Sequence, residues 1–254
     1  VGELGKDNSG VDVSISGLDF DNLPSLAAAY ENASLTLADS QAKRINSFNN
    51  DCHLTAIAGT TGADITLRNV GISDSHAPGV GSGENDILGL IEGVDGDLVL
   101  DRVTLDSNVQ GRAVSWHNSA GVATAKIVSS KILDSGGLRL DANTSQIVNT
   151  AFYTHGQTPA NRITTSRGAT TIKASTLYWM QPVCQPACGV NGIGLQVTGT
   201  GTFDLSSSAI GAVATFPNSG PLLFGDKARF TSDDTTWVQQ TANQSNAALQ
   251  TILP

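Results

Sequence analysis

The chain has little of several features that define familiar protein classes. Charged residues make up only 15% and aromatic residues only 5% of its 254 residues, and it contains one Met and three Cys. The scarcity of Glu and Lys excludes a coiled coil, whose heptads are rich in both. With 14 Lys and Arg against 23 Asp and Glu, the net charge of −9 argues against a protein that binds the phosphate backbone of nucleic acids.

Long apolar runs are also missing. No stretch reaches the 18 consecutive apolar residues that indicate a transmembrane helix, so we expect no membrane span. The opening VGELGKDNSG lacks the basic and then apolar pattern of a signal peptide, and we expect a mature form or an excised domain. Hydrophobic residues still make up 39% of the chain and recur throughout, which excludes a disordered tail.

The three cysteines support no metal site. Cys184 and Cys188, in the segment CQPAC, either close a small disulfide loop or remain free thiols, because spacing alone does not settle the geometry. Cys52 has no obvious partner and is expected to behave as a small buried hydrophobe. No His or further Cys stands nearby at zinc-site spacing, so we expect no metal and no cofactor.

A short internal repeat is the main feature of the sequence. Each copy alternates apolar residues around an apolar anchor, as in ITLRNVGISDS at 65–75 and LVLDRVTLDSN at 98–108. In six of seven copies another apolar residue follows the anchor by five positions, and an earlier match places Val13 and Leu18 in these roles. The anchors lie 20 to 33 residues apart, at Leu67, Leu100, Ile127, Ile147, Ile172, Leu205 and Phe230.

An interval that varies by insertion but never falls below about 20 residues is typical of a parallel β-solenoid. Two positions after the anchor, small polar residues suit a sharp bend, at Asn69, Ser129, Asn149, Ser207 and Ser232. Arg102 and Ala174 depart from this pattern. A Gly-led apolar strand follows several copies, at 87–93, 111–116, 136–140, 192–197 and 220–224. One coil is therefore a short strand, a polar bend, a short strand, a loop and a Gly-led strand.

We predict an all-β fold, a single-stranded right-handed parallel β-helix of about seven to nine coils that forms one domain over residues 1–254. A β-sandwich would not preserve one internal frame seven times, and the Leu and Asn pattern of leucine-rich repeats is missing. Residues 1–60 would hold N-terminal coils and a capping segment, 61–237 the regular coils, and 238–254 a C-terminal cap or tail. The segment DNLPSLAAAYEN predicts a short helix near 23–32.

The copies resemble the right-handed parallel β-helix proteins of the pectate-lyase-like superfamily. More closely, they are similar to secreted bacterial repeat proteins whose coils carry a Gly-Gly-apolar strand followed by apolar-Thr-apolar and Asn-containing bends. The segment LDSGGLRLDANTSQIVNTAFYTHG, at 133–156, carries that pattern best, and the resemblance covers about residues 60–237. It implies a right-handed β-helix that is secreted or lies at the cell surface, used for adhesion and structure or for acting on polysaccharide.

Candidate glycan-facing residues follow from the needs of acidic polysaccharides. Uronates need cationic groups that neutralise their carboxylates, and a lyase needs a base as well. Basic residues that would fall on two or three successive coils are Arg112, Lys126, Lys131 and Arg139, and Trp116, His117 and Asp141 could line a groove with them. Tyr153, Tyr178 and Trp179 offer apolar faces to sugar rings. A solvated outer face explains the same charges.

No Gly-His-Gly and no Arg-Ile-Lys appears, and Arg-Ile-Thr at 162–164 is a poor substitute for the latter, so we assign no catalytic residue. Asp74, Asp106 and Asp134 suit bends better than a Ca²⁺ site. We expect a non-catalytic secreted or cell-surface protein with an adhesion, scaffold or filament role, whose partners are polysaccharide, other surface proteins or its own solenoid ends. A polysaccharide lyase or hydrolase, or a carbohydrate-binding module, is the alternative.

Overall fold

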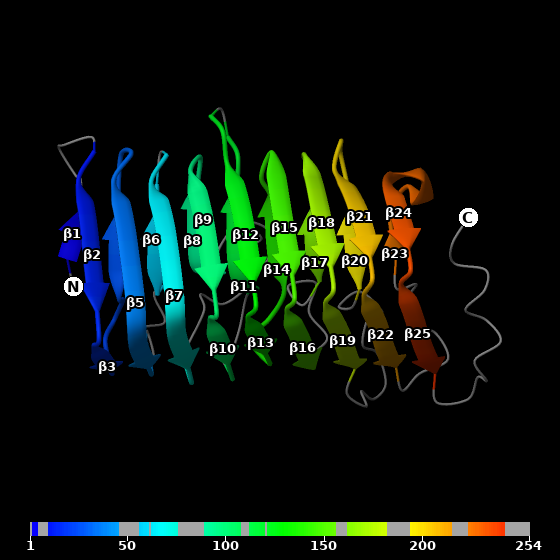
Figure 1. Cartoon of the computed structure of the whole chain (residues 1–254), viewed down its shortest axis with the longest axis horizontal. Coiled ribbons are helices and arrows are strands. Elements are labelled where there is room, and N and C mark those ends of the chain that lie inside the picture. Colours follow the sequence, from blue (N-terminus) through cyan, green and yellow to red (C-terminus); the bar gives the residue numbers. More distant parts are fainter. Residues whose placement is uncertain are drawn as a thin grey trace, which may run out of the picture.

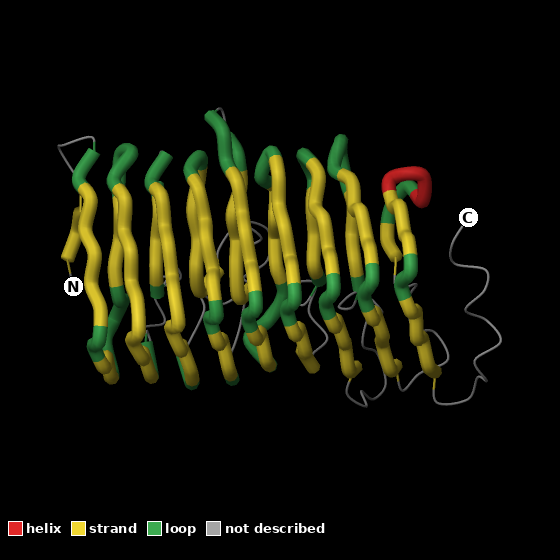
Figure 2. The backbone as a smooth tube through the Cα atoms, viewed as in Figure 1, coloured by secondary structure: helices red, strands yellow, loops and turns green. Residues whose placement is uncertain are grey.

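The computed structural model describes residues 2–4, 10–45, 56–60, 62–75, 89–107, 112–119, 121–155, 162–181, 194–214 and 223–241. Within these ranges the chain is almost entirely β-strand, and the single helical element is a 3₁₀ turn at Lys227–Arg229 (Figure 2). No helix in the described ranges is long and apolar enough to cross a membrane.

One parallel sheet, which we call sheet A, contains nine strands that each come from a separate turn of the chain. Strands that lie side by side in sheet A are two or three strands apart along the chain, so the chain passes through the second sheet between them. In order, the strands are β1 (Gly2–Leu4), β4 (Ala27–Ala29), β6 (Ile57–Gly59), β8 (Gly89–Val94), β11 (Arg112–His117), β14 (Leu138–Asp141), β17 (Ile163–Thr165), β20 (Leu195–Val197) and β23 (Leu223–Phe224).

The second parallel sheet has 16 strands and bends along its length into two faces, which we call B1 and B2. Face B1 contains β2 (Asp12–Ser16), β5 (Ser34–Lys43), β7 (Asp64–Ser73), β9 (Asp97–Asp101), β12 (Thr124–Val128), β15 (Thr144–Val148), β18 (Ala169–Lys173), β21 (Thr202–Ser206) and β24 (Phe230–Asp233). Face B2 contains β3 (Asp19–Asp21), the second halves of β5 and β7, β10 (Thr104–Asp106), β13 (Lys131–Leu133), β16 (Ala151–His155), β19 (Thr176–Gln181), β22 (Ala209–Ala214) and β25 (Thr236–Thr241).

Each coil therefore runs once through sheet A, face B1 and face B2, and nine coils stack along the long axis of the molecule (Figure 1). This arrangement is compatible with a parallel β-helix-like solenoid. We number the coils from the N-terminus, so that β1 belongs to coil 1 and β23 to coil 9. The predicted order of strand, bend, strand, loop and Gly-led strand is confirmed, and all five predicted Gly-led segments contribute to sheet A.

The bend between B1 and B2 is a column of left-handed residues. One residue per coil has a φ between 45° and 70°, at Gly17, Asp39, Asn69, Arg102, Ser129, Asn149, Ala174, Ser207 and Asp234. Asn and Asp adopt this conformation with the least strain among non-glycine residues, which explains the small polar residues in the repeat. Hydroxyls at the following position lock the bend, as where Ser130 Oγ donates to Val128 O at 2.8 Å and accepts from Val103 N at 3.1 Å.

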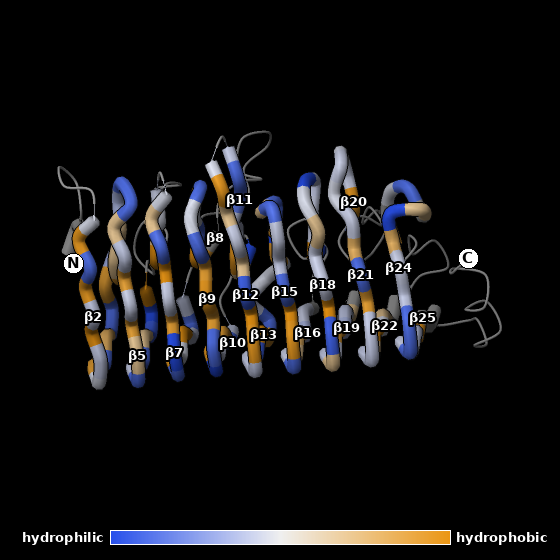
Figure 3. Tube along the Cα trace, turned by 45° about the horizontal axis from the view of Figure 1, so that its top comes forward, coloured by the Kyte–Doolittle hydropathy of each residue, from blue (hydrophilic) through white to orange (hydrophobic). Residues whose placement is uncertain are grey.

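The core is a narrow column of stacked aliphatic side chains. Six of the seven predicted anchors lie in register in adjacent coils and are 0% to 1% exposed, at Leu67, Leu100, Ile127, Ile147, Ile172 and Leu205. Figure 3 shows the resulting alternation of hydrophobic and hydrophilic residues along the strands. Burying a side chain of this size stabilises the fold by about 1.5–3 kcal/mol, so repetition of the column is the main source of stability.

The first and last copies of the repeat were predicted two residues out of register. Leu205 lies opposite Ser232, whereas Phe230 stacks on Phe203 with ring centroids 5.5 Å apart. At the other end, Ile15 lies in the anchor column in place of Val13, and Leu18 is 44% exposed. The error has a simple cause: side chains alternate with a period of two, so a shift of two residues preserves the pattern.

The predicted helix near 23–32 is wrong. Ala27–Ala29 forms β4, which pairs in parallel with β1 and β6, and Glu31 and Asn32 adopt left-handed φ values of 51° and 62°. Together with β5 this segment completes coil 2. Pairing and burial of the small Ala side chains in the stack outweigh their preference for a helix, which is worth less than about 1 kcal/mol per residue.

Candidate functional site

The two parallel sheets distribute the predicted glycan-facing residues over different faces. Arg112, Trp116 and His117 lie on β11 of sheet A, and Arg139 and Asp141 lie on β14 beside them. The other members are on the second sheet, with Lys126 on β12, Lys131 on β13 and Trp179 on β19. The single groove predicted from the sequence therefore does not form, because every coil turns the chain through three directions within about 25 residues.

Both tryptophans are part of the core and offer no face to a sugar ring. The side chains of Trp116 and Trp179 are 0% exposed. The indole of Trp116 donates to Gly96 O at 2.9 Å and packs over Gly93, where an added Cβ would lie 2.1 Å from the ring. The ring of Trp179 packs on Phe152 with centroids 5.2 Å apart. The prediction that Trp116 and Trp179 face a glycan is therefore wrong, because both side chains are buried.

The outer face of sheet A gathers the remaining polar residues into one cluster. The register aligns Ser115, Arg139, Thr164 and Gln196 in one outward column across four successive coils. The guanidinium of Arg112 reaches across two coils and donates to Thr164 Oγ1 at 3.2 Å. Parallel strands lie about 4.8 Å apart, so groups distant in sequence meet here within a few ångströms.

A hollow of about 270 Å³ opens on this cluster, and we call it the sheet A hollow. It is lined by Arg112, Arg139, Asp141, Thr164, Thr165, Ser166, Gln196 and Thr198. Arg112 is only 6% exposed and Asp141 only 3% exposed. Guanidinium groups on two adjacent coils, together with hydroxyl and amide side chains, make this a site for an oxyanion such as a carboxylate or a sulfate.

Both carboxylate oxygens of Asp141 accept hydrogen bonds. Its Oδ2 accepts from Arg139 Nε at 2.5 Å, and its Oδ1 accepts from the backbone N–H of Ser166 at 2.5 Å. A buried carboxylate needs such partners, since an uncompensated charge is costly to bury. Asp141 therefore orients Arg139 in the hollow and neutralises one positive charge.

Arg162 adds a third guanidinium at the edge of the cluster. It is 6% exposed, and its Nη1 donates to Gln196 Oε1 at 2.9 Å. Burial lowers the pKa of Arg162 from its ordinary value, although an arginine remains charged in proteins. The hydrogen bond to Gln196 holds the amide in the same outward column that Arg139 occupies.

His117 lies beside Asp141 at the end of β11, in surroundings that favour its neutral form. Desolvation by burial and the charge of Arg139 lower the pKa of His117, and Asp141 and Asp95 only partly oppose this effect. Among the described residues, no hydrogen-bond partner reaches the buried Nδ1 of His117 or the buried Oγ of Ser115.

Sequence reasoning found four residues of the cluster and missed the rest. Arg112, His117, Arg139 and Asp141 were named, whereas Arg162, Thr164 and Gln196 were not. The tripeptide Arg-Ile-Thr at 162–164 was noticed only for its difference from a catalytic motif. Its alignment with Gly-Leu-Arg at 137–139 was the signal that could have revealed it, because the two segments enter sheet A in register.

The predicted basic residues on the second sheet are separate from the cluster. Lys126 and Lys131 are exposed side chains on β12 and β13, as the interpretation of a solvated outer face requires. The possible disulfide between Cys184 and Cys188, and Cys52, lie outside the described residues. In the described ranges, no three His, Cys, Asp or Glu side chains come close enough to hold a metal ion.

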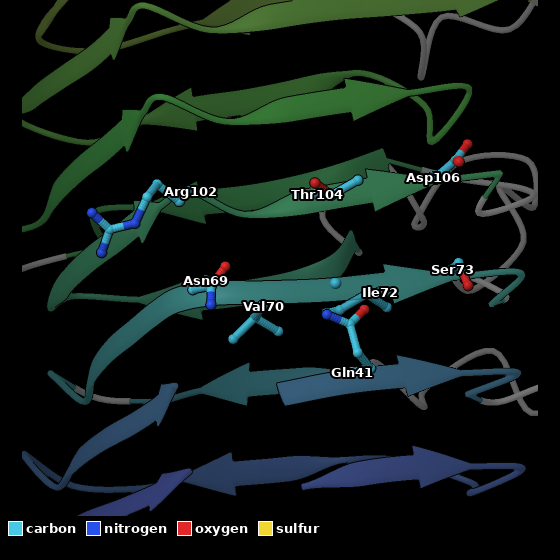
Figure 4. Close-up of a pocket in the computed structure, with 9 residues that line it drawn as sticks. Gln41, Asn69, Val70, Ile72, Ser73, Arg102, Thr104 and Asp106 are labelled. Atoms are coloured by element: carbon cyan, nitrogen blue, oxygen red, sulfur yellow. The ribbon is translucent and has the colours of Figure 1, made fainter. Parts of the chain in front are cut away.

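A second hollow, of about 320 Å³, lies on face B2 between β5, β7 and β10 (Figure 4). It exists because Gly71 has no side chain between Gln41 and Thr104, its neighbours in the column. Arg102, at one end, forms an ion pair with Asp101 at 3.2 Å and is largely exposed. The hollow contains no buried charged group among its lining residues, so we place the candidate site at sheet A.

The bend aspartates divide between two positions. Asp74 and Asp134 adopt left-handed φ values of 50° and 47° at the end of face B2, whereas Asp106 lies one residue earlier in its coil, in register with Ser73 and Leu133. The three carboxylates thus do not form one column.

Comparison with known proteins gives no name to this arrangement: no family model, no curated protein and no solved structure matches the chain.

Proposed function

We propose that the protein is a non-catalytic, secreted or cell-surface β-helix that adheres to an acidic polysaccharide through the sheet A hollow. The finer assignment of the fold, a right-handed β-helix of the pectate-lyase-like superfamily, belongs to the same proposal. It rests on the resemblance of the coils and on the near-universal right-handedness of parallel crossovers.

The observation that carries the proposal is the buried guanidinium of Arg112 at the hollow. Among the described residues, Arg112 and Arg139 line the hollow together with the carboxylate of Asp141, and Glu92 stands in the same column one coil before Ser115. Two guanidinium groups thus meet at one hollow on a chain whose net charge is −9. A low-dielectric surrounding strengthens the attraction of these groups for an anionic sugar.

The engagement of Asp141 favours binding over hydrolysis. A glycoside hydrolase needs two carboxyl groups that act on the scissile bond, one as acid and one as base or nucleophile. Both oxygens of Asp141 already accept hydrogen bonds from Arg139 and Ser166. This carboxylate is thus a positioning group for Arg139.

The test is binding of polygalacturonate to the full chain, measured by calorimetry at low and high salt. Arg112→Gln should weaken binding about tenfold to hundredfold, because a hydrogen bond to a charged group contributes about 1.5–3 kcal/mol. Lys131→Gln is the matched control, since it removes the same charge from an exposed site on face B2. High salt should weaken binding by the wild type.

Equal losses in Arg112→Gln and Lys131→Gln would refute the proposal, because attraction would then follow net charge alone. Absence of binding by the wild type to polygalacturonate, alginate and sulfated glycans would refute it as well. Unchanged thermal midpoints of the variants show that the fold persists.

One observation favours a second candidate, a polysaccharide lyase. Burial favours the neutral form of His117, and Arg139 lies in the adjacent coil. A neutral imidazole could take the C5 proton next to a uronate carboxylate while a C4–C5 double bond forms, the C4–O bond breaks and the departing O4 oxygen takes a proton from solvent water. Unsaturated product that disappears in His117→Gln would establish the lyase in place of the binding protein.

A further inference from the structure

One column of outward side chains on face B2 changes from charged and polar residues to aromatic and apolar residues toward the C-terminal coils. The register aligns Leu133, Tyr153, Tyr178, Gly211 and Val238 over coils 5 to 9. In the earlier coils the same column contains charged and polar residues, including Asp21, Lys43 and Asp106. The strip over the last four coils is therefore distinct from the rest of the face.

The two tyrosine rings are stacked and lie along the solenoid axis. Their centroids are 5.9 Å apart and their planes differ by only 8°. This separation exceeds the strand spacing of about 4.8 Å, as expected for rings that are offset along the sheet. The Tyr153 hydroxyl donates to Met180 Sδ at 3.8 Å, and Met180 is 39% exposed on β19.

Gly211 allows the ring of Tyr178 to lie over the sheet. A Cβ added at Gly211 would lie 3.3 Å from Tyr178 Cδ2, and the glycine itself is buried. The next residue in the column, Val238, is 36% exposed. A side chain at position 211 would push the ring away from the sheet, so the glycine shapes the aromatic surface.

The strip carries no charge in the part of coils 6 to 9 whose side chains the structure describes. The neighbouring outward column contains Ala151, Thr176, Ala209 and Thr236, which are small or hydroxylated. Desolvation by burial, Asp134 and Tyr178 raise the pKa of Tyr153, so its hydroxyl stays protonated at neutral pH. Aromatic faces bordered by hydroxyls suit the C–H faces of uncharged sugar rings.

We propose that Tyr153 and Tyr178 form a platform on face B2 that binds the ring faces of a neutral polysaccharide chain. The size of the strip favours this occupant over a protein partner. Four strands about 4.8 Å apart and two outward positions about 7 Å apart give roughly 130 Å², whereas a stable protein interface buries about 800 Å² per partner. The strip lies on a different face from the sheet A hollow, so the two sites are independent.

The experiment is retention of the full chain on insoluble cellulose, chitin, xylan and β-1,3-glucan, measured as the partition between pellet and supernatant. The wild type is expected to be retained on at least one of them. Tyr178→Ala should lower the partition coefficient at least tenfold on that polysaccharide, and Tyr178→Phe should preserve it because the ring face remains. Gly211→Val should also lower retention by displacing the ring.

Arg112→Gln separates this site from the sheet A hollow, since it should leave retention on neutral polysaccharide unchanged. Retention that is lost in Arg112→Gln but kept in Tyr178→Ala would overturn the platform. Failure of the wild type to bind any of the four polysaccharides would overturn it too, as would a self-association that Tyr178→Ala abolishes in sedimentation without any retention on glycan. Thermal midpoints show which variants remain folded.

Discussion

Ala174 is the bend residue of coil 7, and it offers a sharp test of the bend column. Its φ is 49°, in the left-handed region, and its side chain is exposed. The equivalent residue of the preceding coil is Asn149, whose side-chain amide donates to Ser129 Oγ at 3.2 Å. Ala174 is thus a strained residue whose methyl group makes no buried contact that would offset the strain.

The magnitude follows from two opposing effects of Ala174→Gly. Removing the Cβ relieves a strain of about 1–2 kcal/mol, which is the cost of left-handed geometry for a residue with a side chain. Glycine also makes the unfolded chain more flexible, which lowers stability by about 0.5–1 kcal/mol. We expect the free energy of unfolding to rise by about 0.5–1 kcal/mol.

Ala209→Gly is the matched control. Ala209 is exposed on β22 and is not left-handed, so only the flexibility of the unfolded chain changes, and stability should fall by about 0.5–1 kcal/mol. Urea denaturation of both variants measures the difference. If the two substitutions change the free energy of unfolding in the same direction, strain at the bend does not control the stability of this fold.

Two further predictions concern hydroxyls in the core and a histidine at the site. Thr170 Oγ1 is buried and has no hydrogen-bond partner among the described residues, so Thr170→Val should stabilise the protein by about 1 kcal/mol. Thr150 Oγ1 donates a hydrogen bond to Val148 O at 3.0 Å, so Thr150→Val should destabilise the protein by about as much. Urea denaturation of the two variants measures both changes. Burial and Arg139 hold the folded pKa of His117 below 6.5, so the unfolded chain takes up this proton first as pH falls. Stability should therefore decrease from about pH 7 to about pH 5, and His117→Gln should reduce that decrease; an identical pH profile in the variant would contradict this assignment.

The stacked parallel strands were predictable because their sequence signal is local and repeated. Ile127 and Ile147 stand at the same place in their copies, and each is flanked by the same alternation and the same small polar bend residue. Coil 2 escaped prediction because Ala42 stands where other copies have a large apolar residue. The helix was predicted in error because the preference of Ala27–Ala29 for a helix is weaker than parallel pairing on both sides.

The candidate site was only half visible in the sequence. Arg112, His117, Arg139 and Asp141 lie within 30 residues, and their charge marked them. Thr164 and Gln196 are ordinary polar residues, and they join the site only through the stacking of β14, β17 and β20. Lys131 is closer in sequence to Arg139 than Arg112 is, yet it faces a different direction because a loop and a turn of the coil lie between them.

In coils 3 to 8, sequence alone determined the strands of faces B1 and B2, the bends between them and the residues of the aliphatic column, because these depend on neighbours within one coil and on a period of two. Only the tertiary structure decided which polar side chains meet, because the loop lengths that bring the coils into register vary from copy to copy. The same is true of burial: Trp116 and Trp179 read as surface aromatics but fill the core, whereas Tyr153 and Tyr178 form an outer surface. In a stacked fold, position along one strand sets the direction of a side chain, and the register between coils sets its partners.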